Sequence, residues 1–215
     1  TFINEIADLC EKTGADVQQV ARGIGLDNRI GRTFLHAGPG YGGSCFPKDT
    51  LALLKTAQDF EAPQAIVEAV VQTNDKRKRA MGRKVLQAIG DDVRGKVVAI
   101  LGLTFKPNTD DMRDSPAIAI VQTLQDAGAV VHAYDPEGMA NAREVLDDIV
   151  YFDDPYAAMD GAEALAIVTE WNEFRALDLA RVQAKLKGMV LVDLRNIYDR
   201  DEVEMLGIKY VGVGR

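Results

Sequence analysis

The architecture of this 215-residue chain is set by one apolar run of strand length, Val97-Val98-Ala99-Ile100-Leu101-Gly102. A second such run follows at Val130-Val131-His132-Ala133-Tyr134-Asp135. Between the two runs, Ser115-Pro116 is a helix start and Gly128 is a helix stop. A strand, a helix and a second strand in this order predict a βαβ unit.

The same alternation continues to the end of the chain. Short apolar runs predict further strands over residues 150–152, 164–169, 189–193 and 208–213. Helical stretches separate them over residues 139–146, 155–159, 174–186 and 201–206. Strands that alternate with helices predict a doubly wound parallel sheet, so we expect an α/β, Rossmann-like domain over residues 91–215.

The first 90 residues show a helical period instead. We expect helices from the first residue to Thr13-Gly14, over residues 17–24, from Lys48 onwards, and from Pro63 to Ile89. A glycine-rich, irregular loop over residues 25–47 separates the second helix from the third. A loop of this length is unusual in a compact domain unless it has a function. We therefore predict an all-helical region over residues 1–90.

Composition narrows the class of protein. The net charge of −8 and the pI near 4.9 argue against a general nucleic-acid binder. Two cysteines and two histidines are too few for a zinc cluster of the usual spacing, and we expect no metal. With no apolar run of membrane-spanning length, no signal peptide and no disulfide framework, we expect a cytoplasmic protein without membrane partners.

Three local features need an interpretation. The chain has no initiator Met and no capping residue ahead of Phe2, so we interpret it as a fragment that begins inside a helix. Cys10 lies on the apolar face of that helix, which predicts a core residue. The basic run Lys76-Arg77-Lys78-Arg79 lies inside the long helix, and we interpret it as a solvated or interface-facing surface rather than a phosphate site.

One glycine motif is misleading. Gly38-Pro39-Gly40-Tyr41-Gly42-Gly43 matches the G-x-G-x-x-G dinucleotide pattern letter for letter. No buried strand leads into it and no βαβ unit surrounds it, so we reject that interpretation. The corresponding turn of the true βαβ unit, residues 102–106, lacks the glycine spacing. A nucleotide bound at that sheet is therefore not bound by the standard NAD fingerprint.

The segment Gly42-Gly43-Ser44-Cys45-Phe46-Pro47-Lys48-Asp49 carries the strongest chemical signal. Its glycines let the backbone approach a ligand closely. A thiol at or just before a helix N-terminus, with a lysine three residues on, has surroundings that favour the thiolate. Asp49 is placed to orient or deprotonate a water. We therefore predict that Cys45 is a catalytic thiol.

This segment, residues 40–50, resembles the active-site segment of the UDP-glucose 6-dehydrogenase family. The resemblance extends over the whole chain in order, through residues 2–6, 27–31, 102–116, 169–174 and 193–196. It implies the family's central helical dimerisation domain followed by its C-terminal nucleotide-sugar domain, with the N-terminal NAD-binding domain absent.

The resemblance implies a four-electron oxidation of the C6 alcohol of UDP-glucose to a carboxylate, with two NAD⁺. Cys45 would capture the aldehyde as a thiohemiacetal that becomes a thioester, and Asp49 would activate the water that hydrolyses it. The family's catalytic lysine and asparagine, and its threonine and glutamate from the first domain, lie ahead of Thr1. We therefore expect this chain alone to be inactive.

The resemblance also assigns binding roles. Lys48 and Arg113 match positions near the NAD. Three aspartates flank Arg113, and by themselves they favour Arg113 as an ion-paired turn residue. Arg29 would reach the substrate of a neighbouring subunit, which implies a homodimer built on the long helix. The positions that match substrate-binding residues are Arg29, Phe34, His36, Gly38, Tyr41, Gly42, Phe105, Lys106 and Arg195.

Two alternatives stay open. The first is a dehydrogenase of the same mechanism for GDP-mannose or a UDP-N-acetylhexosamine. Ser44 and the run Phe46-Pro47-Lys48-Asp49 favour UDP-glucose over UDP-N-acetylmannosamine, and GDP-mannose is harder to exclude. The second is a non-catalytic nucleotide-sugar-binding or dimerisation module, which the thiol of Cys45 argues against, because binding alone needs no thiol.

Overall fold

The computed structural model describes residues 1–90 and 92–215. Asp91, at which the predicted second domain begins, lies outside the described residues. Six strands form one sheet in the order β3-β2-β1-β4-β5-β6, and every neighbouring pair is parallel. This confirms the doubly wound parallel sheet. The strands are β1 (Val97–Leu101), β2 (Val130–Tyr134), β3 (Ile149–Tyr151), β4 (Ala164–Ile167), β5 (Val190–Asp193) and β6 (Lys209–Val211).

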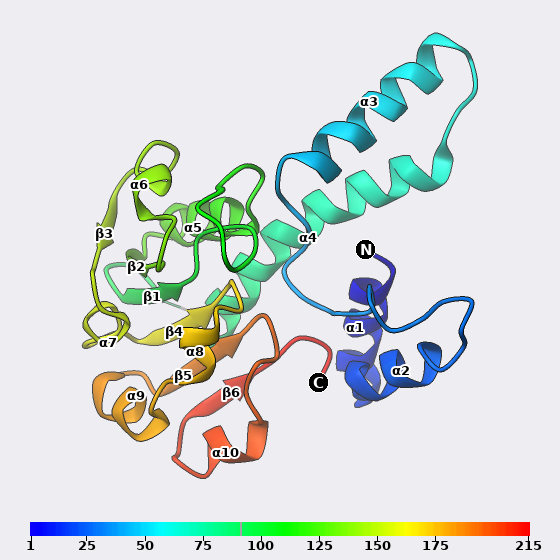
Figure 1. Ribbon diagram of the computed structural model, residues 1–215. Coiled ribbons are helices and arrows are strands. Elements are labelled where there is room, and N and C mark those ends of the chain that lie inside the picture. The colour runs from blue at the N-terminus through cyan, green and yellow to red at the C-terminus, as the bar shows by residue number, and fades with distance from the viewer. Residues whose placement is uncertain (91) are drawn as a thin grey trace.

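The described part of the chain also contains ten helices, which Figure 1 labels. The helices of the first 90 residues are α1 (Phe2–Thr13), α2 (Val17–Ile24), α3 (Cys45–Asp59) and α4 (Ala65–Ile89). Those that follow are α5 (Pro116–Asp126), α6 (Met139–Ala142), α7 (Pro155–Ala158), α8 (Asn172–Arg175), α9 (Leu179–Lys185) and α10 (Arg200–Glu204). The predicted start of α5 is confirmed, because the Ser115 hydroxyl accepts a hydrogen bond from the amide of Ala117 at 3.2 Å.

Helices cover both faces of the sheet, and the side chains of β1 alternate between the two cores. Val98 and Ile100 are fully buried in the core that includes residues of α1, α4 and α5. Ala99 and Leu101 are fully buried in the core under α7, α8, α9 and α10. Because α4 belongs to the first 90 residues and packs on α5, the helical region and the sheet share one core. Cys10 is buried in that core, as predicted.

The first half of α4 pairs with α3 in a hairpin that projects away from the sheet (Figure 1). Ile66 of α4 lies in this hairpin, and its side chain is 82% exposed. Burial on α4 begins at Asn74, where the helix reaches the rest of the molecule. Phe46, Leu51 and Phe60 of the same hairpin are also exposed.

Several predicted helix boundaries differ from the structure. The third helix begins at Cys45 rather than at Lys48, and the long helix begins at Ala65 rather than at Pro63. The helix predicted over residues 174–186 is two helices, because Asp178 accepts hydrogen bonds from the amides that start α9. The helix predicted over residues 139–146 ends at Ala142. No helix among the described residues is both long enough and apolar enough to cross a membrane.

Candidate functional site

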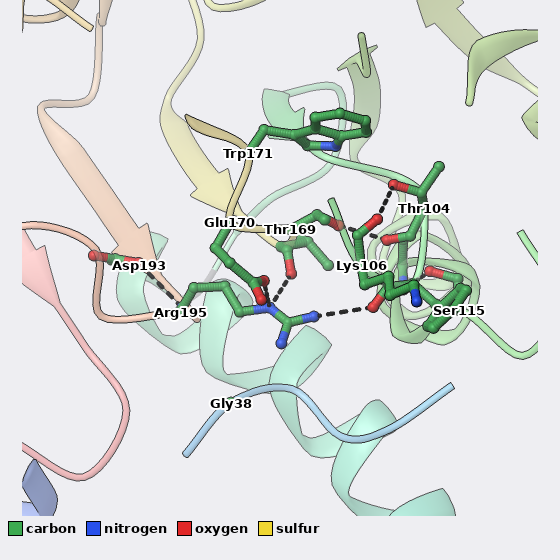
Figure 2. A network of polar contacts seen from close by, with 12 residues as sticks. Gly38, Thr104, Lys106, Ser115, Thr169, Glu170, Trp171, Asp193 and Arg195 are labelled. Carbon is green, nitrogen blue, oxygen red and sulfur yellow. Dashed lines mark hydrogen bonds and ion pairs between the residues drawn. The ribbon is translucent and has the colours of Figure 1, made fainter. Parts of the chain in front are cut away.

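The carboxyl ends of parallel strands are where doubly wound sheets bind ligands, at the point where the strand order reverses. Here that point lies between β1 and β4, because the chain leaves β1 towards β2 on one side and β4 lies on the other. The loops that follow β1, β4 and β5 meet at this edge (Figure 2). Thr169, after β4, donates to the carbonyl of Thr104, after β1, at 2.6 Å. The crevice is therefore braced by side chains of its own loops.

Arg195, after β5, is the central cation of this crevice. Its Nε donates to the carbonyl of Val168 at 2.7 Å and its Nη2 to the carbonyl of Phe105 at 3.4 Å (Figure 2). The carboxylate of Glu170 lies 2.9 Å from Nε, and the Arg195 side chain is only 16% exposed. Burial lowers the pKa of this guanidinium, and the charges of Glu170 and Asp193 oppose that shift. The result is a fixed positive charge at the strand ends.

The glycine loop that precedes Cys45 lies against this crevice. A Cβ on Gly38 would lie 3.4 Å from Nη1 of Arg195, and a Cβ on Gly42 would lie 2.3 Å from the carbonyl oxygen of Asp114. Gly43 has a φ of +86°, and a Cβ there would lie 2.7 Å from the ring of Phe105. At Gly42 and Gly43 the approach is too close for a Cβ, so only glycine fits there. The structure thus brings together four of the predicted binding residues. They are Gly38, Gly42, Phe105 and Arg195.

Helix α4 holds the same loop from its other side. Asn74 accepts a hydrogen bond from the amide of Tyr41 at 2.9 Å and donates to its carbonyl at 3.0 Å. Arg77 donates to the carbonyl of Gly38 at 3.1 Å, and Asn4 of α1 accepts from the amide of Gly38 at 2.9 Å. The backbone polar groups of Gly38 and Tyr41 are therefore paired with side chains of α1 and α4.

These contacts correct, for two of its four residues, the interpretation of the basic run on α4 as a solvated or interface-facing surface. Arg77 is 4% exposed and pairs with Asp8, and Lys78 donates to the carbonyl of Asp114 at 2.9 Å. Burial lowers the pKa of the Lys78 ammonium. Lys76 and Arg79 are exposed. The helical period was the available signal, because it places Arg77 on the same face as the buried residues further along α4.

Cys45 is the first residue of α3 and its thiol is exposed. Its sulfur lies 3.7 Å from the hydroxyl of Ser44, and it stands at the positive end of the helix dipole. One turn on, Lys48 and Asp49 form an ion pair at 3.3 Å, and both side chains are exposed. The ring of Phe46 packs against that of Tyr41 at 5.5 Å between centroids. The thiol therefore faces outward at the end of a loop that is itself held on two sides.

Arg113 faces outward near the thiol. Its guanidinium pairs with Asp111 at 2.8 Å, so the ion-paired turn that its neighbours favour is present. The hydrogen bond from Arg113 to Asp111 raises the pKa of this guanidinium most, and the charge of Cys45 adds a smaller increase. Lys106 lies beside the crevice, with Nζ 5.2 Å from the ring centroid of Phe105.

Two predicted substrate residues lie apart from the crevice. Arg29 has a side chain that is 89% exposed and pairs with Asp27, and Phe34 is 87% exposed. Neither lines the cavity of about 330 Å³ beside Arg195. His36 does line that cavity. Sequence reasoning missed three further arginines of its lining, which come from separate segments and share no motif: Arg22, Arg32 and Arg175.

Two family models match the chain. The central domain of the UDP-glucose/GDP-mannose dehydrogenase family matches residues 1–76. The UDP binding domain of the same family matches residues 99–200. The two models thus match most of the helical region and most of the sheet, from within β1 to a point before β6.

Similar proteins carry matching names. The UDP-glucose 6-dehydrogenase of Rhizobium meliloti is 67% identical over all 215 residues, which make up 49% of that protein. A UDP-glucose 6-dehydrogenase of Bacillus subtilis is 46% identical over the whole chain and 47% of its own length. Among solved structures, a UDP-glucose dehydrogenase from Pyrobaculum islandicum superposes with a TM-score of 0.85 at 38% identity, covering 99% of this chain and 47% of that one.

The chain spans about half the length of the curated relatives it matches. Both family models and these relatives agree with the resemblance that the sequence motifs carry. The chain belongs to the UDP-glucose/GDP-mannose dehydrogenase family.

Proposed function

We propose that the whole protein containing this chain is an NAD-dependent UDP-glucose 6-dehydrogenase, which oxidises UDP-glucose to UDP-glucuronate. The observation that carries the proposal is an exposed thiol, Cys45, at the end of a glycine loop that packs against a largely buried cation, Arg195. A sugar nucleotide whose diphosphate lies near Arg195 is an anionic ligand suited to such a crevice. The names of the relatives support UDP-glucose as the sugar nucleotide.

In this mechanism the C6 alcohol is first oxidised to an aldehyde. The sulfur of Cys45 adds to the aldehyde carbon, and the carbonyl oxygen takes up a proton to give a thiohemiacetal. Loss of a hydride and of the hydroxyl proton leaves a thioester on the sulfur. A water activated by Asp49 then attacks the thioester carbon, releases the carboxylate and returns the thiol. Covalent capture keeps the aldehyde from escaping between the two oxidations.

NAD⁺, when bound, supplies the two-electron acceptor for each oxidation. In the described residues the chain offers it two exposed cations beside the thiol, Lys48 and Arg113. These suit contact with a phosphate-bearing ligand from outside. The turn after β1 lacks the dinucleotide glycine spacing, so we place the remainder of the NAD site outside this chain. We accordingly expect that the 215-residue chain alone does not oxidise UDP-glucose.

Residues 1–90 serve in this proposal as the dimerisation region with the thiol loop, and residues 91–215 as the nucleotide-sugar domain. The exposed apolar side chains of the α3–α4 hairpin support pairing with a second copy, because Phe60 and Ile66 are 79% and 82% exposed. Arg29 is 89% exposed and does not line the cavity beside Arg195, which suits a residue that serves a neighbouring subunit. Sedimentation of the chain tests this: a dimer is expected, and a monomer at every concentration contradicts it.

The proposal places the protein in the cytoplasm, which suits two free thiols and an acidic composition.

The test of the proposed activity is the yield of NADH when the whole protein is given UDP-glucose, GDP-mannose or UDP-N-acetylmannosamine. Two NADH per UDP-glucuronate formed are expected with UDP-glucose. Turnover with GDP-mannose alone would identify GDP-mannose as the substrate and leave the thiol mechanism unchanged. No oxidation of any nucleotide sugar would favour a binding module and overturn the proposal.

A further inference from the structure

Asp135 is a fully buried carboxylate that directly follows β2 and accepts an unusual number of hydrogen bonds. Its Oδ2 accepts from the amides of Leu103 and Thr104 at 2.7 and 3.1 Å, and from the indole of Trp171 at 3.3 Å. Its Oδ1 accepts from the amide of Gly138 at 2.7 Å. A buried charge is tolerated when it is paired in this way with many donors.

The position of these donors is informative. In dinucleotide-binding βαβ units, the amides of the turn after the first strand bind a phosphate, and the acid that ends the second strand binds a ribose. In this chain the acid that ends β2 turns back onto the turn after β1. The carboxylate of Asp135 therefore occupies the amides of Leu103 and Thr104 that a phosphate would use.

The same contacts fix the loop that leads into the candidate crevice. The hydroxyl of Ser115 donates to the carbonyl of Leu103 at 2.6 Å, and Thr169 donates to the carbonyl of Thr104. With Asp135 on the two amides, all four backbone polar groups of these two residues are paired with side chains. Close packing reinforces this, because a Cβ on Gly138 would lie 2.4 Å from Cγ2 of Thr104.

We propose that Asp135 is an internal substitute for a phosphate and a positioning residue for the substrate site. Its carboxylate keeps phosphate groups out of the turn after β1 and holds the backbone of Thr104, and so the next two residues, in the place where they meet the ligand. Those two residues are Phe105 and Lys106, so this inference rests on the proposed function. The sheet is thereby reserved for a nucleotide sugar that binds through Arg195 and Lys106, rather than for a dinucleotide.

The experiment replaces the carboxylate in this chain with Asp135→Ala and supplies small anions. Amide resonances of Leu103 and Thr104 are followed by NMR during titration with formate and with inorganic phosphate, and UDP affinity is measured by calorimetry. In the variant, both anions should shift these two amides saturably, whereas the wild type should not respond. UDP affinity should fall about tenfold or more, as expected for loss of a charge-assisted contact, and formate should restore most of it.

A matched control is Asp178→Asn, because Asp178 also accepts two backbone amides, at 2.9 and 3.2 Å, but at the start of α9. It should bind UDP as the wild type does. If Asp135→Ala does not fold, the isosteric Asp135→Asn replaces it, and the same loss of UDP affinity is expected. A folded Asp135 variant that binds UDP as tightly as the wild type, or amides of Asp135→Ala that ignore both anions, would overturn the inference. A wild-type chain that does not bind UDP would count against the proposed function instead, since the anion titration does not depend on UDP.

Discussion

Two segments of this chain share the pattern Asp-x-Arg and use it in opposite ways. In Asp111-Met112-Arg113 and in Asp193-Leu194-Arg195, the arginine amide donates to the aspartate, at 2.9 and 3.1 Å. In the first segment the guanidinium folds back onto the same aspartate and stays exposed. In the second, the aspartate is fully buried and the guanidinium turns away to the carbonyls of neighbouring loops.

The two segments differ in the burial of the arginine side chain, and this burial rather than the shared motif determines what the arginine binds. Asp193 lies at the end of a central strand. Its carboxylate accepts hydrogen bonds from the amide of Tyr198 at 2.9 Å and from the hydroxyl of Tyr210 at 3.2 Å. Burial raises the pKa of Asp193. Arg195 is thereby left to reach across the crevice, whereas Arg113 remains a surface cation. Asp27 and Arg29 repeat the exposed form.

The largest effect is expected from Arg195→Ala. The substitution leaves the partly buried Glu170 without its cation and removes the donors to two carbonyls, so the free energy of unfolding should fall by about 2 kcal/mol. UDP affinity should fall about a hundredfold. Calorimetry and urea unfolding of the chain measure both. Arg113→Ala is the matched control and should leave UDP affinity unchanged; an equal loss in the two variants would break the comparison.

A smaller effect, on stability alone, is expected in the basic run of α4, which also contains one buried and one exposed arginine. Arg77→Met removes a buried donor to the carbonyl of Gly38, so the free energy of unfolding should fall by about 2 kcal/mol. Arg79→Met removes only a surface pair with Asp75 and should cost less than about 0.5 kcal/mol. Thermal or urea unfolding compares the two variants. Similar losses would mean that Arg77 does not hold the glycine loop.

The sequence predicted the sheet well, because its strands are continuous apolar runs bounded by clear helix starts and stops. It did not predict the partners of Arg77 and Lys78, because charge alone suggests solvent and nothing local shows that a distant glycine loop needs donors. The break at Asp178 was missed because an aspartate inside a helical period is also compatible with an exposed helical residue. Tertiary pairing decided each of these positions.

The candidate site was predictable only where a local pattern carried it. The glycine loop and Cys45 share one segment, so their proximity follows from the chain itself. The proximity of Gly38 to Arg195 joins residues far apart in sequence, and the family resemblance indicated only that both bind the substrate. The role of Asp135 does not follow from the apolar run that it ends, and an acidic residue directly after a buried strand is the available signal.

The smallest expected effect is on the pH dependence of stability, through Asp111 and Arg113. The hydrogen bond with Arg113 lowers the pKa of Asp111 in the folded chain. A lowered folded pKa stabilises the fold above the ordinary aspartate pKa, and this contribution is lost as the pH falls through that value towards the folded pKa. Urea unfolding from about pH 6 to about pH 3 should therefore show a shallower acid loss in Asp111→Asn. An unchanged pH profile would show that the Asp111–Arg113 pair contributes nothing to stability.

The most direct test of the account is the covalent role of Cys45 in the whole protein. UDP-glucose and NAD⁺ are mixed with the wild type and with Cys45→Ser, the reaction is quenched, and intact-protein mass spectrometry is combined with NADH counting. The wild type should carry a nucleotide-sugar adduct on Cys45 and release two NADH per UDP-glucuronate, and the serine variant should show neither. Full release of two NADH by Cys45→Ser would contradict the account and leave Cys45 as an exposed loop-end thiol.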